Sequence, residues 1–272
     1  MRDTFRLRNA PVYGIILVIL FSLGIVFLPA DIVGKVFSSD ELISRLSGIT
    51  AIRLIGAAFL IFLSADVGFG LFRFSRKLPF ALPLFAVAVN NLPIIALATG
   101  AAEVTRAQLI PLLLAECMAV AMFEEFAFRG LVFPFTLKAF GSRRHAPFMA
   151  VITSGCLFGL LHLVNIPSAG AAALLQVGYS ALIGAACAVI VLYTANIIPA
   201  VLFHGIYNFC GYLVPELGAG TLWDAPTVAV TAVIAVAAAV WAVFLLKTCA
   251  PINVSLILGD DSLPVPSDRR DS

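Results

Sequence analysis

The strongest constraint on this chain is a charged motif inside an apolar segment. Residues 109–135 are almost entirely hydrophobic, yet positions 123–130 read Phe-Glu-Glu-Phe-Ala-Phe-Arg-Gly. At the centre of a membrane helix each such charge costs about 2.5–3.5 kcal/mol, whereas each Leu, Ile or Phe returns only about 0.3–0.6 kcal/mol. A helix built from this segment therefore cannot face lipid on all sides, and its charges must point into protein.

Helical spacing gives the two carboxylates of this motif different surroundings. Glu125 and Arg129 are four residues apart, so they share a helix face and can pair. Glu124 points about 100° away from Glu125, because each residue turns an α-helix by that angle. Arg129 can thus neutralise Glu125 and leave Glu124 facing the interior of a helix bundle.

Composition places the whole chain in a lipid bilayer. Of its 272 residues, 61% are hydrophobic and 12% are charged, and the mean hydropathy is +1.06. A soluble domain carries about 25% charged residues. The net charge of +2 gives no reason to expect nucleic acid as a partner. We expect an all-α, polytopic membrane helix bundle.

About eight segments are apolar enough to be transmembrane helices. They cover residues 12–28, 49–72, 82–99, 109–135, 148–166, 169–194, 197–214 and 226–246. We predict one membrane domain over 1–250, with its motif-bearing core at about 109–214, and a polar, disordered tail over 251–272. Most basic residues precede the first segment or follow the second, fourth and eighth ones, so the positive-inside rule predicts that both termini are cytoplasmic.

Polar side chains recur in three of these segments. His162 and His204 lie within predicted spans, with Phe158 one turn before the first histidine and Asn208 one turn after the second. A single intramembrane histidine is as often a hydrogen-bonded packing residue as a functional one, but several converging polar groups favour a functional cavity. We expect Glu124, His162, His204 and Asn208 to surround one cavity.

Three other charges receive a structural interpretation. Arg53 and Asp66 fall near the two ends of the second predicted span, and Glu116 lies in the fourth. We interpret them as inward-facing pairs that support the fold.

Taken together, the motifs Glu124-Glu125-x-x-x-Arg129, Phe158-x-x-x-His162 and His204-x-x-x-Asn208 resemble the motif set of the CPBP family. This family comprises the CAAX prenyl endopeptidases and the bacteriocin-processing intramembrane proteases. The order, the helix placement and the distances between the motifs fit over residues 123–208.

The resemblance implies an eight-helix membrane endopeptidase with a water-filled cavity, and we place it in a bacterial cell membrane. Glu124 resembles the catalytic carboxylate, whose helix and charge Glu125 and Arg129 hold. His162 resembles its partner at the water. His204 and Asn208 resemble the pair that binds the substrate carbonyl, where one good donor to the oxyanion contributes about 2.7–4 kcal/mol.

The role of a metal stays open. Two histidines and a glutamate are an accepted catalytic zinc set, and the family has been described both as metalloproteases and as glutamic proteases. The H-E-x-x-H signature is absent, so Glu124, His162 and His204 would have to act as ligands from three different helices. We favour a reaction without a cofactor and keep the zinc-dependent version as the alternative.

The expected activity is hydrolysis of a peptide bond in a membrane-anchored or lipidated protein or peptide. A polytopic transporter is one alternative, since intramembrane Glu, Arg and His are normal there too, but it predicts repeat symmetry that the charged residues do not show. A non-catalytic immunity or scaffold protein, which would not need Glu124, is the other.

Overall fold

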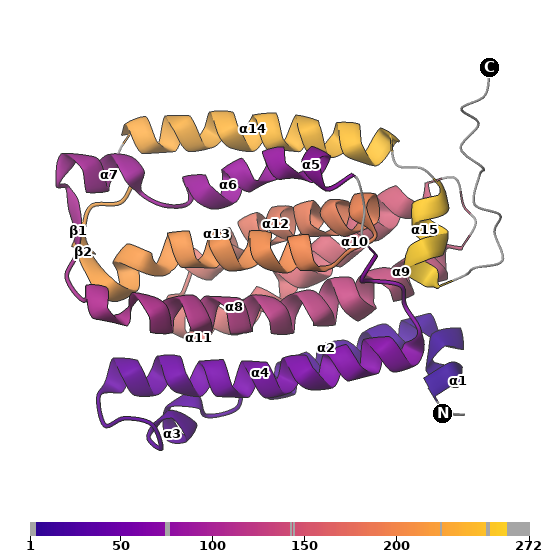
Figure 1. Ribbon diagram of the computed structural model, residues 1–272, viewed down its shortest axis with the longest axis horizontal. Helices are drawn as coiled ribbons and strands as arrows, with labels where there is room; N and C mark the ends of the chain where they lie inside the picture. The colour runs from indigo at the N-terminus through magenta and orange to yellow at the C-terminus, as the bar shows by residue number, and fades with distance from the viewer. Residues whose placement is uncertain are drawn as a thin grey trace.

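The fold is a bundle of helices that lie roughly side by side (Figure 1). The computed structural model describes residues 4–73, 77–141, 143, 145–223, 225–248 and 251–259. Its elements are α1 (Thr4–Asn9), α2 (Pro11–Val26), α3 (Ala30–Gly34), α4 (Glu41–Val67), α5 (Leu78–Ala81), η1 (Leu82–Leu84), α6 (Phe85–Asn90), α7 (Ile94–Thr99), β1 (Ala102–Val104), η2 (Ala107–Leu109), α8 (Ile110–Ala127), η3 (Phe128–Val132), α9 (Phe133–Phe140), α10 (Ala146–Leu161), η4 (His162–Asn165), α11 (Ile166–Ala169), α12 (Ala172–Thr194), α13 (Ile198–Leu217), β2 (Gly218–Gly220), α14 (Ala225–Thr248) and α15 (Pro251–Leu258).

All eight predicted apolar segments contain helix, which confirms the all-α membrane fold. Within the described residues, five helical stretches are long and apolar enough to cross a membrane, namely α4, α10 with η4 and α11, α12, α13 and α14. α2 and the stretch Leu78–Asn90 are shorter apolar helices. The motif-bearing segment is continuous from α8 through η3 to α9. The third predicted segment breaks between α6 and α7, where Pro93 is the N-cap of α7.

The second predicted span was misplaced at its start. α4 begins at Glu41 rather than near residue 49, because Asp40 caps it by accepting a hydrogen bond from the Ile43 amide at 3.0 Å. It ends at Gly68, whose φ of 81° suits glycine. Arg53 therefore lies in the middle of a 27-residue helix instead of near its end. Asp66 is exposed, so the prediction that it points inward is wrong.

The prediction of a disordered tail from residue 251 is wrong for its first residues. α15 packs onto the bundle through Ile257, which is buried, and through Asn253, whose amide donates to the carbonyls of Leu192 and Tyr193 at 2.9 and 2.8 Å. Residues 260–272 lie outside the described part of the chain. α1 and α15 lie at the same end of the molecule (Figure 1).

Small residues bring α10 and α12 into close contact, as their spacing predicts. A Cβ atom on Gly155 would lie 2.8 Å from the Ala181 carbonyl oxygen, and one on Gly159 would lie 2.5 Å from the Val177 carbonyl oxygen. On α12, Ser180, Gly184 and Ala188 are all buried. This contact lets the backbones of α10 and α12 approach each other closely.

Candidate active site

The pair formed by Glu125 and Arg129 is sealed inside the bundle. Arg129 lies in the π-helical turn η3 that follows α8, and its NH1 donates to Glu125 Oε1 at 3.0 Å. Both side chains are 0% exposed. The Arg129 guanidinium also stacks on the Phe158 ring, with 4.6 Å from Cζ to the ring centre. Gly184 makes room for it, since a Cβ there would lie 2.8 Å from Arg129 NH2. The predicted pairing is confirmed.

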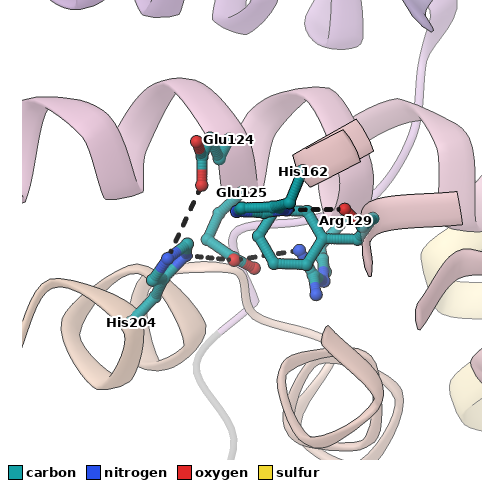
Figure 2. Close-up of polar contacts among 6 residues, drawn as sticks. Glu124, Glu125, Arg129, His162 and His204 are labelled. Carbon is teal, nitrogen blue, oxygen red and sulfur yellow. Dashed lines mark hydrogen bonds and ion pairs between the residues drawn. The ribbon is translucent and has the colours of Figure 1, made fainter. Parts of the chain in front are cut away.

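Glu124 points to a different environment from its neighbour. Its side chain is 16% exposed and lines a cavity of about 950 Å³. Its Oε2 lies 3.6 Å from Nε2 of His204 on α13. Figure 2 shows His204 between the two carboxylates, with one ring nitrogen toward each.

The surroundings of His204 fix where its ring carries a proton. Nδ1 lies 2.7 Å from Glu125 Oε1, the same oxygen that accepts from Arg129. Because an ionised carboxylate only accepts hydrogen bonds, we assign the proton to Nδ1. In the neutral ring, Nε2 then presents a lone pair on the side of Glu124.

His162 is oriented in the same way by a different acceptor. It is the C-cap of α10 and the first residue of η4, inside the stretch Ala146–Ala169 that is long and apolar enough to cross a membrane. Its Nδ1 is 2.9 Å from the Phe158 carbonyl oxygen, which can only accept, so Nε2 again carries the lone pair. The Phe158 ring packs edge-on against both imidazoles, with centroid distances of 4.9 Å to His162 and 5.6 Å to His204. The expectation that Phe158 fixes the His162 ring is confirmed.

The four residues predicted to share a cavity all line it. Glu124 comes from α8, His162 from the end of α10, and His204 and Asn208 from α13. The remaining walls are formed largely by apolar side chains of α10, α12 and α14. No hydrogen bond engages the Asn208 amide from any residue that the structure describes, so its donors are available to a ligand. His145, in contrast, is exposed at the start of α10 and lies away from the cavity.

Several cavity residues were given no role by the sequence. Tyr207 lines the cavity, and its carbonyl accepts from the Asn91 amide at 2.8 Å. Arg45 and Glu216 also line it and form an ion pair. The sequence signal for this part of the cavity was the pair Asn90 and Asn91, because two amides in an apolar segment must find hydrogen-bond partners inside the bundle.

The structure does not gather the candidate zinc ligands into one set among the described residues. Among the described residues, no group of three His, Cys, Asp or Glu side chains is arranged to hold one. Glu124 and His204 are near each other, but His162 does not complete a set with them.

Comparison with known proteins agrees with this geometry. Residues 106–210 match the family described as type II CAAX prenyl endopeptidase Rce1-like. No match is found among curated proteins or among solved structures. The matched segment runs from the connector before α8 into α13 and contains all seven residues of the three motifs. Residues 106–210 thus match a family model that is consistent with the CPBP intramembrane peptidases, and the apolar helices are those of an integral, multi-pass membrane protein.

Proposed function

We propose that the protein is an intramembrane endopeptidase in which Glu124 activates the water that hydrolyses a peptide bond. The observation that carries the proposal is that Glu124 lines one cavity with His162, His204 and Asn208, whereas the adjacent Glu125 is already neutralised. A carboxylate that is not consumed by an ion pair of its own can act as a general base.

Hydrolysis at this site needs one proton to move twice. Glu124 takes a proton from water while the water oxygen bonds to the peptide carbonyl carbon, and the lone pair on His162 Nε2 orients the water by accepting its second hydrogen. When the carbon–nitrogen bond breaks, the proton on Glu124 passes to the leaving nitrogen. Glu124 is then ionised again.

The charge that develops on the carbonyl oxygen needs donors. The Asn208 amide supplies one without any change of protonation. His204 can donate from Nε2 only as an imidazolium, because its Nδ1 proton is engaged with Glu125. The ring lies between the two carboxylates, with Nε2 3.6 Å from Glu124 and Nδ1 2.7 Å from Glu125.

The proposal requires no cofactor, and the zinc-dependent version is the alternative. It has a specific basis, because each imidazole presents Nε2 while an acceptor holds its Nδ1–H, as in zinc-binding histidines. Activity after exhaustive chelation separates the two. Full activity without metal supports the glutamate mechanism, whereas loss of activity and recovery with added zinc supports the alternative.

The proposed substrate is a membrane-anchored or lipidated protein or peptide that enters the cavity from the bilayer. The family profile carries the name of CAAX prenyl endopeptidases, so a prenylated carboxyl-terminal motif is the first substrate to try. We further propose that both termini are cytoplasmic and that the protein resides in a bacterial cell membrane.

A proteomic comparison tests the function. Cells carrying the intact protein, Glu124→Gln or the matched control Asp66→Asn are compared for proteins whose hydrophobic termini differ in mass. We expect shortened proteins with the intact protein and with Asp66→Asn, whose carboxylate is exposed outside the cavity. Identical termini in all three, with normal expression, would contradict a protease and favour a transporter or a scaffold.

A further inference from the structure

The cavity wall contains more charge than the three motifs account for. Its carboxylates are Glu116, Glu124 and Glu216, and its guanidiniums are Arg45 and Arg53. Arg45 is paired with Glu216. Arg53 is therefore the remaining permanent cation among the described residues that line the cavity. It belongs to none of the three motifs, and the proposed reaction gives it no role.

Arg53 is held in the cavity wall by contacts on two sides. Its NH1 donates to the Ile25 carbonyl oxygen at 3.0 Å, in the last turn of α2. Its Cζ lies 5.1 Å above the ring centre of Phe123, the residue before Glu124. α4 and α8, which carry Arg53 and Glu124, pack side by side (Figure 1).

Arg53 and Glu124 line the same cavity from two helices that pack together, and the guanidinium is within electrostatic range of the Glu124 and Glu116 carboxylates. Glu116 already accepts a hydrogen bond from the Cys117 thiol. No described residue donates a hydrogen bond to the Glu124 side chain, and Arg129 is engaged with Glu125.

We propose that Arg53 is the counter-ion of Glu124, a positioning residue that holds this carboxylate in place in the cavity for hydrolysis. Burying a carboxylate in a low-dielectric cavity is unfavourable, and a fixed cation in the same cavity wall offsets part of that cost. The proposal rests on the proposed function and extends the machinery of the site to α4, outside the segment that matches the family profile.

A double-mutant cycle on unfolding tests the pairing without any substrate. Thermal unfolding in detergent is measured for Arg53→Gln, Glu124→Gln and the double variant, with Arg53→Met as a second neutral replacement that keeps a long stem over Phe123. We expect Arg53→Gln to lower the midpoint temperature of unfolding in the wild-type background. In the Glu124→Gln background the same change should lower it much less, because the carboxylate partner of Arg53 is already absent. Equal decreases in both backgrounds would overturn the proposal.

Arg45→Gln is the matched control for this cycle. It removes the same charge from the same helix and the same cavity wall, but Arg45 is paired with Glu216. Its effect on the midpoint should be the same with and without Glu124→Gln. A coupling to Glu124 as large as that of Arg53 would contradict a specific counter-ion.

Kinetics on a fluorescent prenylated peptide with a CAAX terminus give a second readout. Arg53→Gln should lower kcat about tenfold or more with little change in KM, Arg53→Lys should restore most of kcat, and Asp66→Asn, outside the cavity, should leave kcat near the wild-type value. A loss confined to KM, or no rescue by lysine, would contradict the assigned role. If the wild type cleaves nothing, the proposed function fails, while the unfolding cycle still decides the pairing.

Discussion

Glu124 and Glu125 are consecutive residues on one helix, yet they occupy opposite kinds of environment. Glu125 is fully buried and contacts Arg129 and Nδ1 of His204. Glu124 lines the cavity, and its Oε2 lies 3.6 Å from Nε2 of the same imidazole. The difference arises from one residue of helical rotation. Adjacent carboxylates on one membrane helix can therefore have different roles. One forms a buried ion pair, and the other lines a cavity where it is accessible to a ligand.

The largest effect on stability should come from breaking the sealed pair. Arg129→Met leaves the buried Glu125 carboxylate without its cation, which costs about 3–5 kcal/mol of unfolding free energy. The matched change at the more exposed pair, Glu216→Gln opposite Arg45, should cost about 1 kcal/mol or less, since those side chains are 25% and 38% exposed. Chemical unfolding in detergent measures both, and similar losses at the two pairs would contradict the distinction.

Among the residues that line the cavity, Asn208 should give the largest loss of cleavage rate after Glu124. Asn208→Ala removes an oxyanion donor, so cleavage should slow by about 10²–10³-fold, or about 2.7–4 kcal/mol of transition-state stabilisation. The unfolding midpoint should stay near that of the wild type, because no described residue depends on the Asn208 amide. A variant with full activity, or one that loses stability in proportion to activity, would argue against this role.

A smaller loss of stability should follow from adding a side-chain atom next to the buried pair of Glu125 and Arg129. Gly184→Ala places a Cβ 2.8 Å from Arg129 NH2 and 3.0 Å from the Phe158 ring, so overpacking should cost about 1–3 kcal/mol. Gly178→Ala, also in α12, is the control, because a Cβ there meets nothing within 4 Å. Its effect should be neutral or slightly stabilising, since alanine favours a helix more than glycine does. Equal destabilisation by the two substitutions would contradict this packing.

The smallest effect is expected outside the membrane segments, at the start of α4. The hydrogen bond from the Ile43 amide, followed by the Arg106 guanidinium at 3.0 Å, lowers the pKa of Asp40 below its usual 3.8. Its contribution to stability is therefore present above the unfolded pKa and is lost as the pH falls through the folded pKa. The difference in midpoint between wild type and Asp40→Ala should be constant above about pH 5 and should shrink below about pH 3. A difference that does not change with pH would show that the charge contributes nothing.

The sequence was sufficient for the fold class and for the sealed pair, because both follow from hydrophobicity and from the i, i+4 rule. The convergence of His162, His204 and Asn208 followed from the motif resemblance, since no local rule brings α10 and α13 together. The position of Arg53 within its helix was predicted wrongly, because hydrophobicity alone does not locate the polar N-cap Asp40. α4 begins eight residues before the predicted span. The tautomers could not be predicted either, since they depend on a carbonyl and a carboxylate from distant turns.

The central claim is that Glu124, and not Glu125, supplies the base. The most direct test is the initial rate of cleavage by purified protein in liposomes, using a substrate found by the proteomic comparison and measuring wild type and Glu124→Gln with their unfolding midpoints. We predict that the rate of Glu124→Gln falls by about 10²–10⁴-fold while its midpoint stays at or near the wild-type value. A folded Glu124→Gln protein that cleaves the substrate at the wild-type rate would contradict the account.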